Sequence, residues 1–226
     1  MMSEAWTRED FLARLQEVGH QGYHHLHPFH IRMNAGDLDR DSIRLWVANR
    51  FYYQLNIPRK DAAIVSNCPI RDVRRKWIKR IIDHDGAGAE EGGIEKWLRL
   101  GIACGLSSEE MMDERYVRPG VRFAVDAYVN FARTQPWPIS IASSLTELFA
   151  PDLMAKRLDA FQKHYAWIGS DGLDYFRARL TQARQDSDFA LEMTLEHCSD
   201  RNMQEAAVDA LRFKCDVLWA MLDALW

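Results

Sequence analysis

The sequence predicts an all-α helical bundle. Apolar residues recur at steps of three and four along most of the chain, which is the spacing of one helix face. Capping residues, glycines and prolines separate these segments at intervals typical of helices, and the alternating pattern of half-buried strands is absent. The chain has no repeat and no linker-like stretch, so we expect one domain over residues 1–226.

Start and stop signals divide the first half of the chain. Thr7 followed by Asp10 resembles a capping signal, and Gly36 and Gly86 follow apolar segments as helix-ending residues do. The expected helices are one after Thr7, a short one from Pro28 to near Gly36, a long one from about Asp41 to Asn67, and one from Arg71 to His84. We expect 86–93 to be a flexible loop.

Similar signals divide the second half. Ser107 and Glu110 form a capping-box pattern, while Pro136 and Pro138 interrupt the helical spacing. The expected helices run from Ile94 to Cys104, after Ser107, from near Pro119 through Phe131, from Ile139 to Phe149, from about 151 to Tyr165, from about Gly172 to Cys198, and from about Asn202 to Trp226. We expect the last two to be the longest.

Bulk composition excludes several classes of function. Hydrophobic residues make up 47% and charged residues 27%, as in ordinary soluble domains, and the formal net charge of -4 gives no basic surface for nucleic acid. No apolar run approaches the roughly 20 residues of a membrane span, and the N-terminus does not resemble a signal peptide. The four cysteines show no Cys-x-x-Cys spacing. We expect a cytoplasmic protein with reduced cysteines and neither nucleic-acid nor membrane partners.

Residues 46–61 carry two patterns on one predicted helix. Trp46, Val47, Phe51, Tyr52 and Leu55 form an apolar surface, and a neighbouring face carries polar groups. The polar face consists of Arg50, Tyr53, Gln54, Ile57, Lys60 and Asp61. It is either a solvated edge with extended basic side chains or a polar patch on an internal cavity. Pro58 is expected to bend the helix there.

Five histidines crowd into residues 20–30, at positions 20, 24, 25, 27 and 30. Glu17 and His20 form one Glu-x-x-His unit of the kind that di-iron bundles use. Those bundles need two such units and further glutamates, and the sequence has no second unit. The pattern therefore favours a turn whose rings cap helices, and we expect no protein-bound metal.

Isolated polar residues recur in apolar surroundings further along. His84 ends an apolar helix, where the helix C-terminus would favour its charged form, and Lys214 shares a stripe with leucines. Each one alone is more often a satisfied ion pair than a functional group. Most carry the same sign in an acidic chain: Arg50, Lys60, His84, Arg157, Arg179 and Lys214. A cavity lined this way would suit a small polyanion, such as a polycarboxylate.

Several blocks resemble the pyrroloquinoline-quinone synthase (PqqC) family over nearly the whole chain. The blocks are Tyr-His-His-Leu-His-Pro-Phe-His at 23–30, Trp-Val-Ala-Asn-Arg-Phe-Tyr-Tyr-Gln at 46–54, Lys-Asp-Ala-Ala at 60–63, Asp-His-Asp-Gly at 83–86, Gly-Gly-Ile-Glu at 92–95, Gly-Val-Arg-Phe-Ala-Val-Asp-Ala-Tyr at 120–128, Ser-Ser-Leu-Thr-Glu-Leu-Phe-Ala-Pro at 143–151 and Phe-Lys-Cys-Asp-Val-Leu-Trp at 213–219.

The resemblance implies a haem-oxygenase-like (TenA-like) seven-helix bundle, usually a homodimer. It implies the last step of pyrroloquinoline quinone (PQQ) biosynthesis without metal or organic cofactor, PQQ being the product and O2 the co-substrate. The precursor is a partly reduced quinoline dione that bears an amino acid side chain and several carboxylates. It is ring-closed and oxidised by O2, which releases hydrogen peroxide.

The resemblance also implies a set of site residues. The expected catalytic residues are His84 as proton-abstracting base, Tyr175 and Arg179 as stabilisers of reduced oxygen species, and His24 and Lys214. The expected substrate-binding residues are Arg50, Tyr53, Gln54, Lys60, Arg80, Tyr128, Thr146, Glu147 and Arg157. Met154 stands where several members have a histidine near the oxygen site, so Tyr175 and Arg179 would serve there without it.

Two other functions remain open from the sequence. One is a metal- or haem-dependent oxygenase on the same fold, which would use the histidines at 20–30. The other is a PQQ-binding or carrier protein without catalysis.

Overall fold

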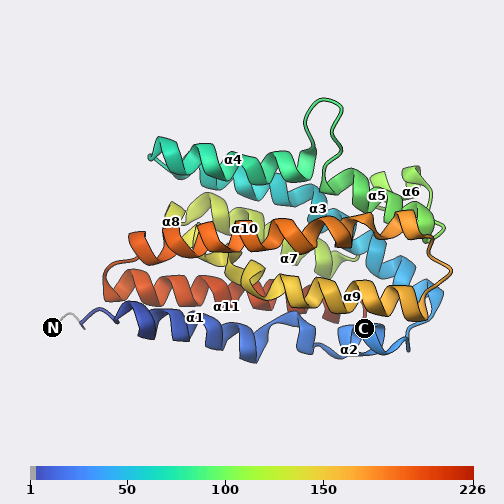
Figure 1. The fold of residues 1–226 in the computed structure, drawn as a ribbon, viewed down its shortest axis with the longest axis horizontal. Helices are drawn as coiled ribbons and strands as arrows, with labels where there is room; N and C mark the ends of the chain where they lie inside the picture. The colour runs from blue at the N-terminus through green and yellow to red at the C-terminus, as the bar shows by residue number, and fades with distance from the viewer. Residues whose placement is uncertain (1–3) are drawn as a thin grey trace.

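The computed structural model describes residues 4–226, including every side chain in that range except those of 151 and 181–186. It confirms the all-α class, because no strand occurs within residues 4–226 (Figure 1). The α-helices are α1 (Arg8–Gly22), α2 (Pro28–Ala35), α3 (Arg40–Asn67), α4 (Arg71–Asp85), α5 (Gly93–Ala103), α6 (Ser108–Met112), α7 (Pro119–Thr134), α8 (Trp137–Ala142), α9 (Ala150–His164), α10 (Asp174–His197) and α11 (Arg201–Asp223).

The described residues thus form eleven α-helices, and the expected count of seven is wrong. Short helices account for most of the difference: α2 has eight residues and ends at Gly36, α8 has six and α6 has five. Three 3₁₀ helices join them, η1 (His24–Leu26), η2 (Ser143–Phe149) and η3 (Ser170–Leu173). The longest helix is α3, with 28 residues, rather than α10 or α11 as expected.

The predicted capping signals are confirmed. Thr7 accepts a hydrogen bond from the backbone N–H of Asp10 at the start of α1, and Ser107 forms a capping box with Glu110 at the start of α6. His27 caps α2, since its Nδ1 accepts from the backbone N–H of Phe29 at 3.0 Å. The interpretation of the histidine run as a capping turn is therefore confirmed for this residue.

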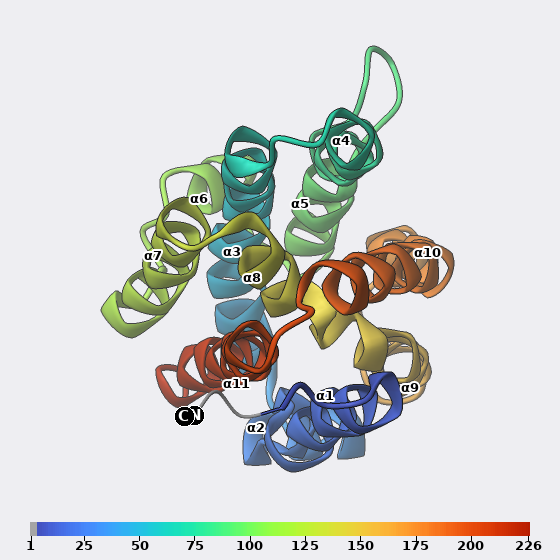
Figure 2. The ribbon, with the colours of Figure 1, turned by 90° about the vertical axis from the view of Figure 1, so that its left-hand side faces the viewer.

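α3 is the central helix of the bundle. It packs against α4, α5 and α7, and the end-on view places it between α7 on one side and α4 and α5 on the other (Figure 2). α11 packs against α1, α7, α8 and η2. Pro58 lies within α3, and the chain is helical on both sides of it. A residue on α3 can therefore meet partners from both halves of the chain.

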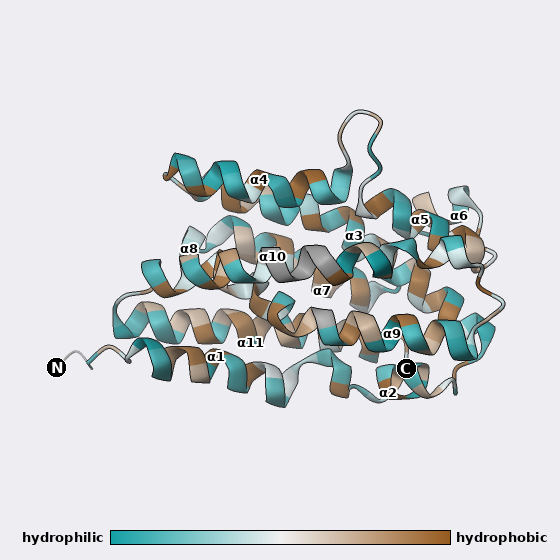
Figure 3. Cartoon of the chain, viewed as in Figure 1, coloured by the Kyte–Doolittle hydropathy of each residue, from teal (hydrophilic) through white to brown (hydrophobic). Residues whose placement is uncertain are grey.

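Two groups of buried apolar side chains form the core. One contains Trp77, Val121 and Leu211, and the other contains Trp97 and Phe161. Each helix also carries hydrophilic residues, and the visible face of α4 is largely hydrophilic (Figure 3). All four cysteines are free and buried. Among the described residues, no helix is long and apolar enough to cross a membrane.

The segment between α4 and α5 forms a protruding hairpin (Figure 1). Ala87 and Glu90 exchange backbone hydrogen bonds of 3.1 and 3.0 Å, and Gly86 and Gly88 adopt the positive φ values that such a tight turn requires. The backbone N–H of Gly92 then donates to Glu95 Oε2 at 2.9 Å, which fixes the start of α5. The expected loop at 86–93 is thus a defined turn beside the end of α4.

η2 replaces the second part of the helix expected over 139–149. α8 ends at Ala142, and Ser143 Oγ donates to the Ser140 carbonyl at 2.6 Å where the backbone tightens into the 3₁₀ form. Gly19 on α1 lets η2 approach closely, because a Cβ at this position would lie 1.9 Å from Cζ of Phe149. This contact sets the position of the 3₁₀ turn that carries Thr146 and Glu147.

Candidate active site

Two adjoining cavities lie inside the bundle. The first has a volume of about 40 Å³, and nine of its lining residues belong to the set expected from the sequence: His24, Arg50, Tyr53, Gln54, His84, Thr146, Glu147, Tyr175 and Arg179. The second has a volume of about 20 Å³ and includes the expected residue Arg157. The side chains that line both cavities are His24, Arg50, Met154, Tyr175 and Leu218. We call these the polar cavity and the side cavity.

Four expected residues lie behind the cavity walls rather than on them. They are Lys60, Arg80, Tyr128 and Lys214, all of them buried. Two of them contact wall residues directly. Lys214 Nζ donates to the Tyr53 hydroxyl at 2.7 Å, and Arg80 Nη2 lies 3.6 Å from Glu147 Oε1. The structure thus brings the whole expected set together, as two layers.

The polar face of 46–61 is buried. Gln54 and Lys60 are each 1% exposed and Asp61 is fully buried. The interpretation of this face as a solvated edge is therefore wrong, and the interpretation as a cavity wall is confirmed. Because α3 is the central helix, its polar face must find partners inside the protein.

Asp61 anchors one cluster of ion pairs. Its Oδ1 accepts hydrogen bonds from Lys60 Nζ at 2.5 Å and Trp77 Nε1 at 2.8 Å, and Arg80 Nε lies 3.6 Å away. Burial would raise the pKa of Asp61, but Lys60 and Arg80 outweigh it and lower the pKa. Lys60 also donates to Ser144 Oγ on η2 at 3.0 Å. The cluster ties α3, α4 and η2 together.

Glu147 anchors a second cluster at the wall of the polar cavity. Its Oε2 accepts from Arg179 Nη2 at 2.5 Å. Burial alone would raise the pKa of Glu147, but Arg179 and Arg80 lower it to about 2, so this carboxylate is ionised at neutral pH. Arg179 is held on the wall by this pair.

Three further cations have no carboxylate within 4 Å among the described side chains: Arg50, Arg157 and Lys214. Aromatic rings hold them instead. Arg50 lies 3.9 Å from the centroid of Tyr53, Lys214 lies 3.6 Å from that of Tyr128, and Arg157 lies 5.1 Å from that of Trp46. Arg157 and Lys214 are buried and Arg50 is half-buried. Because buried charge is costly without a counter-charge, this group favours an anionic ligand.

Burial lowers the pKa values of two of these cations. The pKa of Lys214 is lowered well below its usual value by burial and by Arg50 and Lys60. The pKa of Arg157 is lowered to about 9 by burial and by Arg50, so it remains charged at pH 7. Arg157 Nη2 is buried and makes no hydrogen bond within the described part of the chain. A carboxylate at this atom would remove the penalty.

His84 is a neutral base at the polar cavity. Its Nδ1 lies 2.9 Å from the Arg80 carbonyl, which can only accept, so Nδ1 carries the proton and Nε2 is the free lone pair. Burial and the nearby Arg179 lower its pKa to about 4. The expectation that the helix C-terminus would favour charged His84 is therefore wrong, because desolvation and the guanidinium outweigh the helix dipole.

Tyr175 and Arg179 share one face of α10, as their spacing predicted, and both line the polar cavity. Gln54 Nε2 donates to the Tyr175 hydroxyl at 2.9 Å. Gln54 Oε1 is buried and has no hydrogen-bond partner among the side chains and backbone that the structure describes. The polar cavity therefore presents an available hydrogen-bond acceptor, Gln54 Oε1, close to the Tyr175 hydroxyl.

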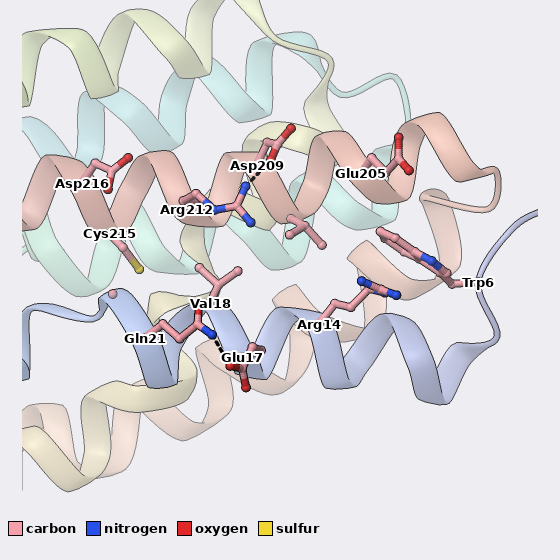
Figure 4. A pocket seen from close by; sticks show the side chains of 12 residues that line it. Trp6, Arg14, Glu17, Val18, Gln21, Glu205, Asp209, Arg212, Cys215 and Asp216 are labelled. Carbon is pink, nitrogen blue, oxygen red and sulfur yellow. Dashed lines mark hydrogen bonds and ion pairs between the residues drawn. The ribbon is translucent and has the colours of Figure 1, made fainter. Parts of the chain in front are cut away.

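A larger hollow lies elsewhere, on the surface between α1 and α11, with a volume of about 580 Å³ (Figure 4). Its cations already have partners: Arg14 stacks on Trp6 at 4.2 Å, and Arg212 pairs with Asp209. Exposed pairs of this kind are worth little energy and create no demand for a ligand. None of the expected site residues lines it.

Sequence reasoning missed several residues at the site, and two of them make polar contacts that matter for its chemistry. His30 lines the side cavity, and Ser144 accepts from Lys60. His30 lies in the histidine run and Ser144 in the block at 143–151, so each stood within a pattern already noted. Helical spacing could not select them, because His27 and His30 look alike in sequence and only packing distinguishes the cap from the cavity wall.

Comparisons with known proteins give a consistent family. Residues 12–224 match the model of the TENA/THI-4/PQQC family. The chain is 56% identical over 225 residues to a pyrroloquinoline-quinone synthase of Pseudomonas aeruginosa, which covers 100% of this chain and 90% of that protein. It is 54% identical over 219 residues to one of Cronobacter sakazakii, which covers 97% and 87%.

Solved structures agree on the fold. A TenA homologue from Pseudomonas syringae pv. tomato superposes with a TM-score of 0.79 at 12% identity, over 100% of this chain and 99% of that one. A domain with a haem-oxygenase-like fold from Shewanella denitrificans gives a TM-score of 0.76 at 11% identity, over 96% and 89%. At these identities the likeness concerns the fold alone.

Proposed function

The chain belongs to the TENA/THI-4/PQQC family, and from this premise we propose that it is a pyrroloquinoline-quinone synthase, as its relatives at 54–56% identity are named. The reaction is the final step of PQQ formation. A quinoline-dione tricarboxylate precursor undergoes ring closure and is oxidised by O2, and hydrogen peroxide is released.

The observation that carries this proposal is the cluster of cations without protein counter-charges, of which Arg157 and Lys214 are buried. Arg50, Arg157 and Lys214 surround the cavities, and none has a carboxylate partner among the described side chains. A tricarboxylate would supply the missing anions. Lys60 and Arg80 already neutralise Asp61, so their proposed role is to hold the second layer and add positive potential.

Proton transfer falls to His84 in this proposal. Its Nε2 is a bare lone pair at the cavity wall, held in that tautomer by the Arg80 carbonyl. A carboxylated substrate would partly neutralise the cations nearby and so raise the pKa of His84 from about 4 towards the range of an effective base. His24 and Lys214 are further proton-transfer groups, and both have lowered pKa values.

The remaining residues position the substrate and oxygen. Tyr175 and Arg179 face the polar cavity together and would stabilise reduced oxygen species. Gln54 offers its free Oε1 to a substrate N–H or O–H group. Tyr53, Thr146 and Glu147 complete the binding surface, and Tyr128 supports Lys214 from behind the wall. Met154, like Tyr175, lies on the wall of both cavities.

We propose that the reaction needs no metal or organic cofactor. A quinoid substrate can supply its own electrons to O2, so the protein has to bind, orient and move protons. The missing second Glu-x-x-His unit supports this. Protein dialysed against a strong chelator should keep its turnover, and activity that is lost on chelation and restored by iron or copper would contradict it.

The polar cavity and the side cavity have volumes of about 40 and 20 Å³, which is room for a few water-sized molecules. A quinoline-sized ligand therefore requires their walls to separate, and ligand entry is a conformational step. We also propose a cytoplasmic homodimer, on the strength of the resemblance, which light scattering on the purified protein would test.

The decisive experiment is aerobic mixing of metal-free protein with the precursor, followed by absorbance of PQQ and an assay of peroxide. Formation of both supports the synthase. Tight PQQ binding without turnover would indicate a carrier protein instead. Turnover that requires added haem or metal would indicate an oxygenase on the same fold.

A further inference from the structure

The side cavity is apolar apart from a few groups. Trp46, Trp97, Phe176, Met221 and Leu222 supply most of its wall. Trp97 turns its polar atom away, since Nε1 donates to the Val47 carbonyl at 2.9 Å.

Asn49 also lines the cavity, but its amide is used elsewhere. Its Nδ2 donates to the carbonyls of Leu45 and Tyr116 at 2.8 and 2.9 Å, and its Oδ1 accepts from the backbone N–H of Arg118 at 2.7 Å. Asn49 therefore offers nothing to a ligand.

Two buried polar atoms on this wall have no hydrogen-bond partner among the described residues, Arg157 Nη2 and His30 Nε2. The two residues are 2% and 1% exposed, and both contact Trp46, with Arg157 5.1 Å and the His30 ring 6.2 Å from its centroid. A buried polar atom without a partner calls for an explanation, and an absent ligand is one.

The chemistry of the two atoms differs in sign. His30 Nδ1 lies 3.0 Å from the His24 carbonyl, so Nδ1 carries the proton and Nε2 can only accept. Burial and the neighbouring Arg157 lower the pKa of His30 well below its usual value, which keeps the ring neutral. Arg157 Nη2 can only donate. The cavity therefore offers one cationic donor and one neutral acceptor.

We propose that the side cavity binds an α-amino-acid group, with its carboxylate on Arg157 and its primary amine donating to His30 Nε2. A carboxylate alone would leave His30 Nε2 without a hydrogen-bond donor. A hydroxyl or an amide would leave Arg157 without a counter-charge. An α-amino acid carries an anion and an N–H donor on adjacent carbons. This inference rests on the proposed function, in which the precursor bears such a group.

The subsite distinguishes substrate from product. The precursor has a free primary amine, whereas ring closure places that nitrogen inside a ring of PQQ. His30 would therefore position the amine before ring closure and lose this contact afterwards, which makes it a residue that favours the precursor over the product.

The test compares two variants and two ligands. In His30→Asn the amide nitrogen can replace Nδ1 at the His24 carbonyl, but nothing reaches the position of Nε2, whereas His30→Gln can place an oxygen there. Binding of the precursor under anaerobic conditions, and of PQQ, is measured by titration. His30→Asn should weaken precursor binding about tenfold, the worth of one such hydrogen bond, and PQQ binding less than about twofold. His30→Gln should retain most of the precursor affinity.

Other outcomes separate the two proposals. Equal weakening of both ligands, or no weakening of either, would overturn the amino-acid subsite. A wild-type protein that binds the precursor but forms no PQQ would overturn the proposed function alone, because the binding comparison needs no turnover. A wild-type protein that binds neither ligand would overturn both. If His30→Asn fails to fold by circular dichroism, His30→Leu provides the variant without an acceptor.

Discussion

His84 shows how one carbonyl and one guanidinium set the chemistry of a residue. The Arg80 carbonyl fixes the proton on Nδ1, and burial with Arg179 keeps the ring neutral. A general base contributes roughly 10²–10⁴-fold in rate, while one neutral ring contact contributes little to binding. We predict that His84→Ala binds precursor and PQQ within about tenfold of wild type but fails to complete oxidation within many wild-type turnovers.

Rapid mixing followed by absorbance checks this prediction, and the variant should stall after ring closure. Added imidazole should restore part of the rate if it enters the space left by the ring. Oxidation at the wild-type rate would show that His84 is not the base. Tyr53, His24 and Lys214 would then be the next candidates, since all three are buried at the cavities.

The unpaired cations make a separate prediction. Arg157→Ala and Lys214→Ala should each weaken PQQ binding by roughly 1.5–3 kcal/mol, the scale of a hydrogen bond to a charged group. Fluorescence titration with PQQ measures it. Arg212→Ala is the matched control, because Arg212 is an exposed cation paired with Asp209 in the surface hollow. Unchanged affinity in both buried variants would show that these cations do not hold the ligand.

Tyr175 and Arg179 define the proposed oxygen-facing wall. Tyr175→Phe with Arg179→Ser should spare ring closure and slow the O2-dependent steps, so that a partly oxidised quinoid intermediate accumulates. Stopped-flow spectra at two oxygen concentrations would detect it. Arg80 Nη2 lies 3.6 Å from Glu147 Oε1 and is unchanged in this variant, so Glu147 should keep one ion pair. Proportionate slowing of every phase would contradict this division of roles.

At the scale of elements, local signals predicted the helices well. α1, α6 and α7 begin within a residue or two of the positions that Thr7, Ser107 and Pro119 indicated, because a cap or a first-turn proline is a local feature of the sequence. η2 could not be predicted in this way. Ser144 is held by Lys60, 84 residues away, and Gly19 on α1 receives Phe149. Tertiary contacts therefore override the helical pattern at 139–149.

Two glycines of α1 offer a matched test of that contact. A Cβ at Gly19 would lie 1.9 Å from Cζ of Phe149, whereas one at Gly22 would lie 3.7 Å from Cβ of Cys215, an ordinary contact. Gly19→Ala should cost about 1–3 kcal/mol of stability and weaken PQQ binding, because Phe149 shares η2 with Thr146 and Glu147. Gly22→Ala should leave stability equal or slightly higher, as alanine favours helix.

Urea unfolding and PQQ titration of both variants provide the measurements. A Gly19→Ala protein as stable as Gly22→Ala would show that Phe149 moves aside at no cost. Loss of stability without loss of PQQ affinity would show that η2 keeps its place in the site when Phe149 is displaced.

At the scale of the molecule, the site joins residues that no local pattern connects. Gln54 meets Tyr175 across 121 residues, and Lys214 meets Tyr53 across 161. The sequence supplied an excess of cations among buried-looking positions, which is a statement about composition, and the resemblance selected the set. Which of these cations are neutralised by Asp61 and Glu147, and which are left for a ligand, depends on packing and emerged only from the structure.

The buried histidines should make the whole fold sensitive to mild acid. His24, His30 and His84 all have pKa values below 6.5 in the folded protein, because burial and nearby cations disfavour their charged forms. Below about pH 6.5 the unfolded chain therefore binds more protons than the folded one, and stability falls as pH falls. With its pKa near 4, His84 alone should cost about 2 kcal/mol between pH 7.5 and pH 5.

Urea unfolding at these two pH values measures the effect, and the carboxylates do not confuse it. The pKa values of Asp61 and Glu147 are lowered, so their stabilising contribution persists above the unfolded values near 4 and is lost only below them. In His84→Gln the loss of stability between pH 7.5 and pH 5 should be smaller, by about the amount that His84 contributes in the wild type. Saturating PQQ should reduce it further, because bound carboxylates offset the cations that depress the histidine pKa values. Stability that stays flat from pH 7.5 to pH 5 would mean that these histidines find counter-charges in the folded protein without a ligand, which would remove the main electrostatic argument for a polycarboxylate site.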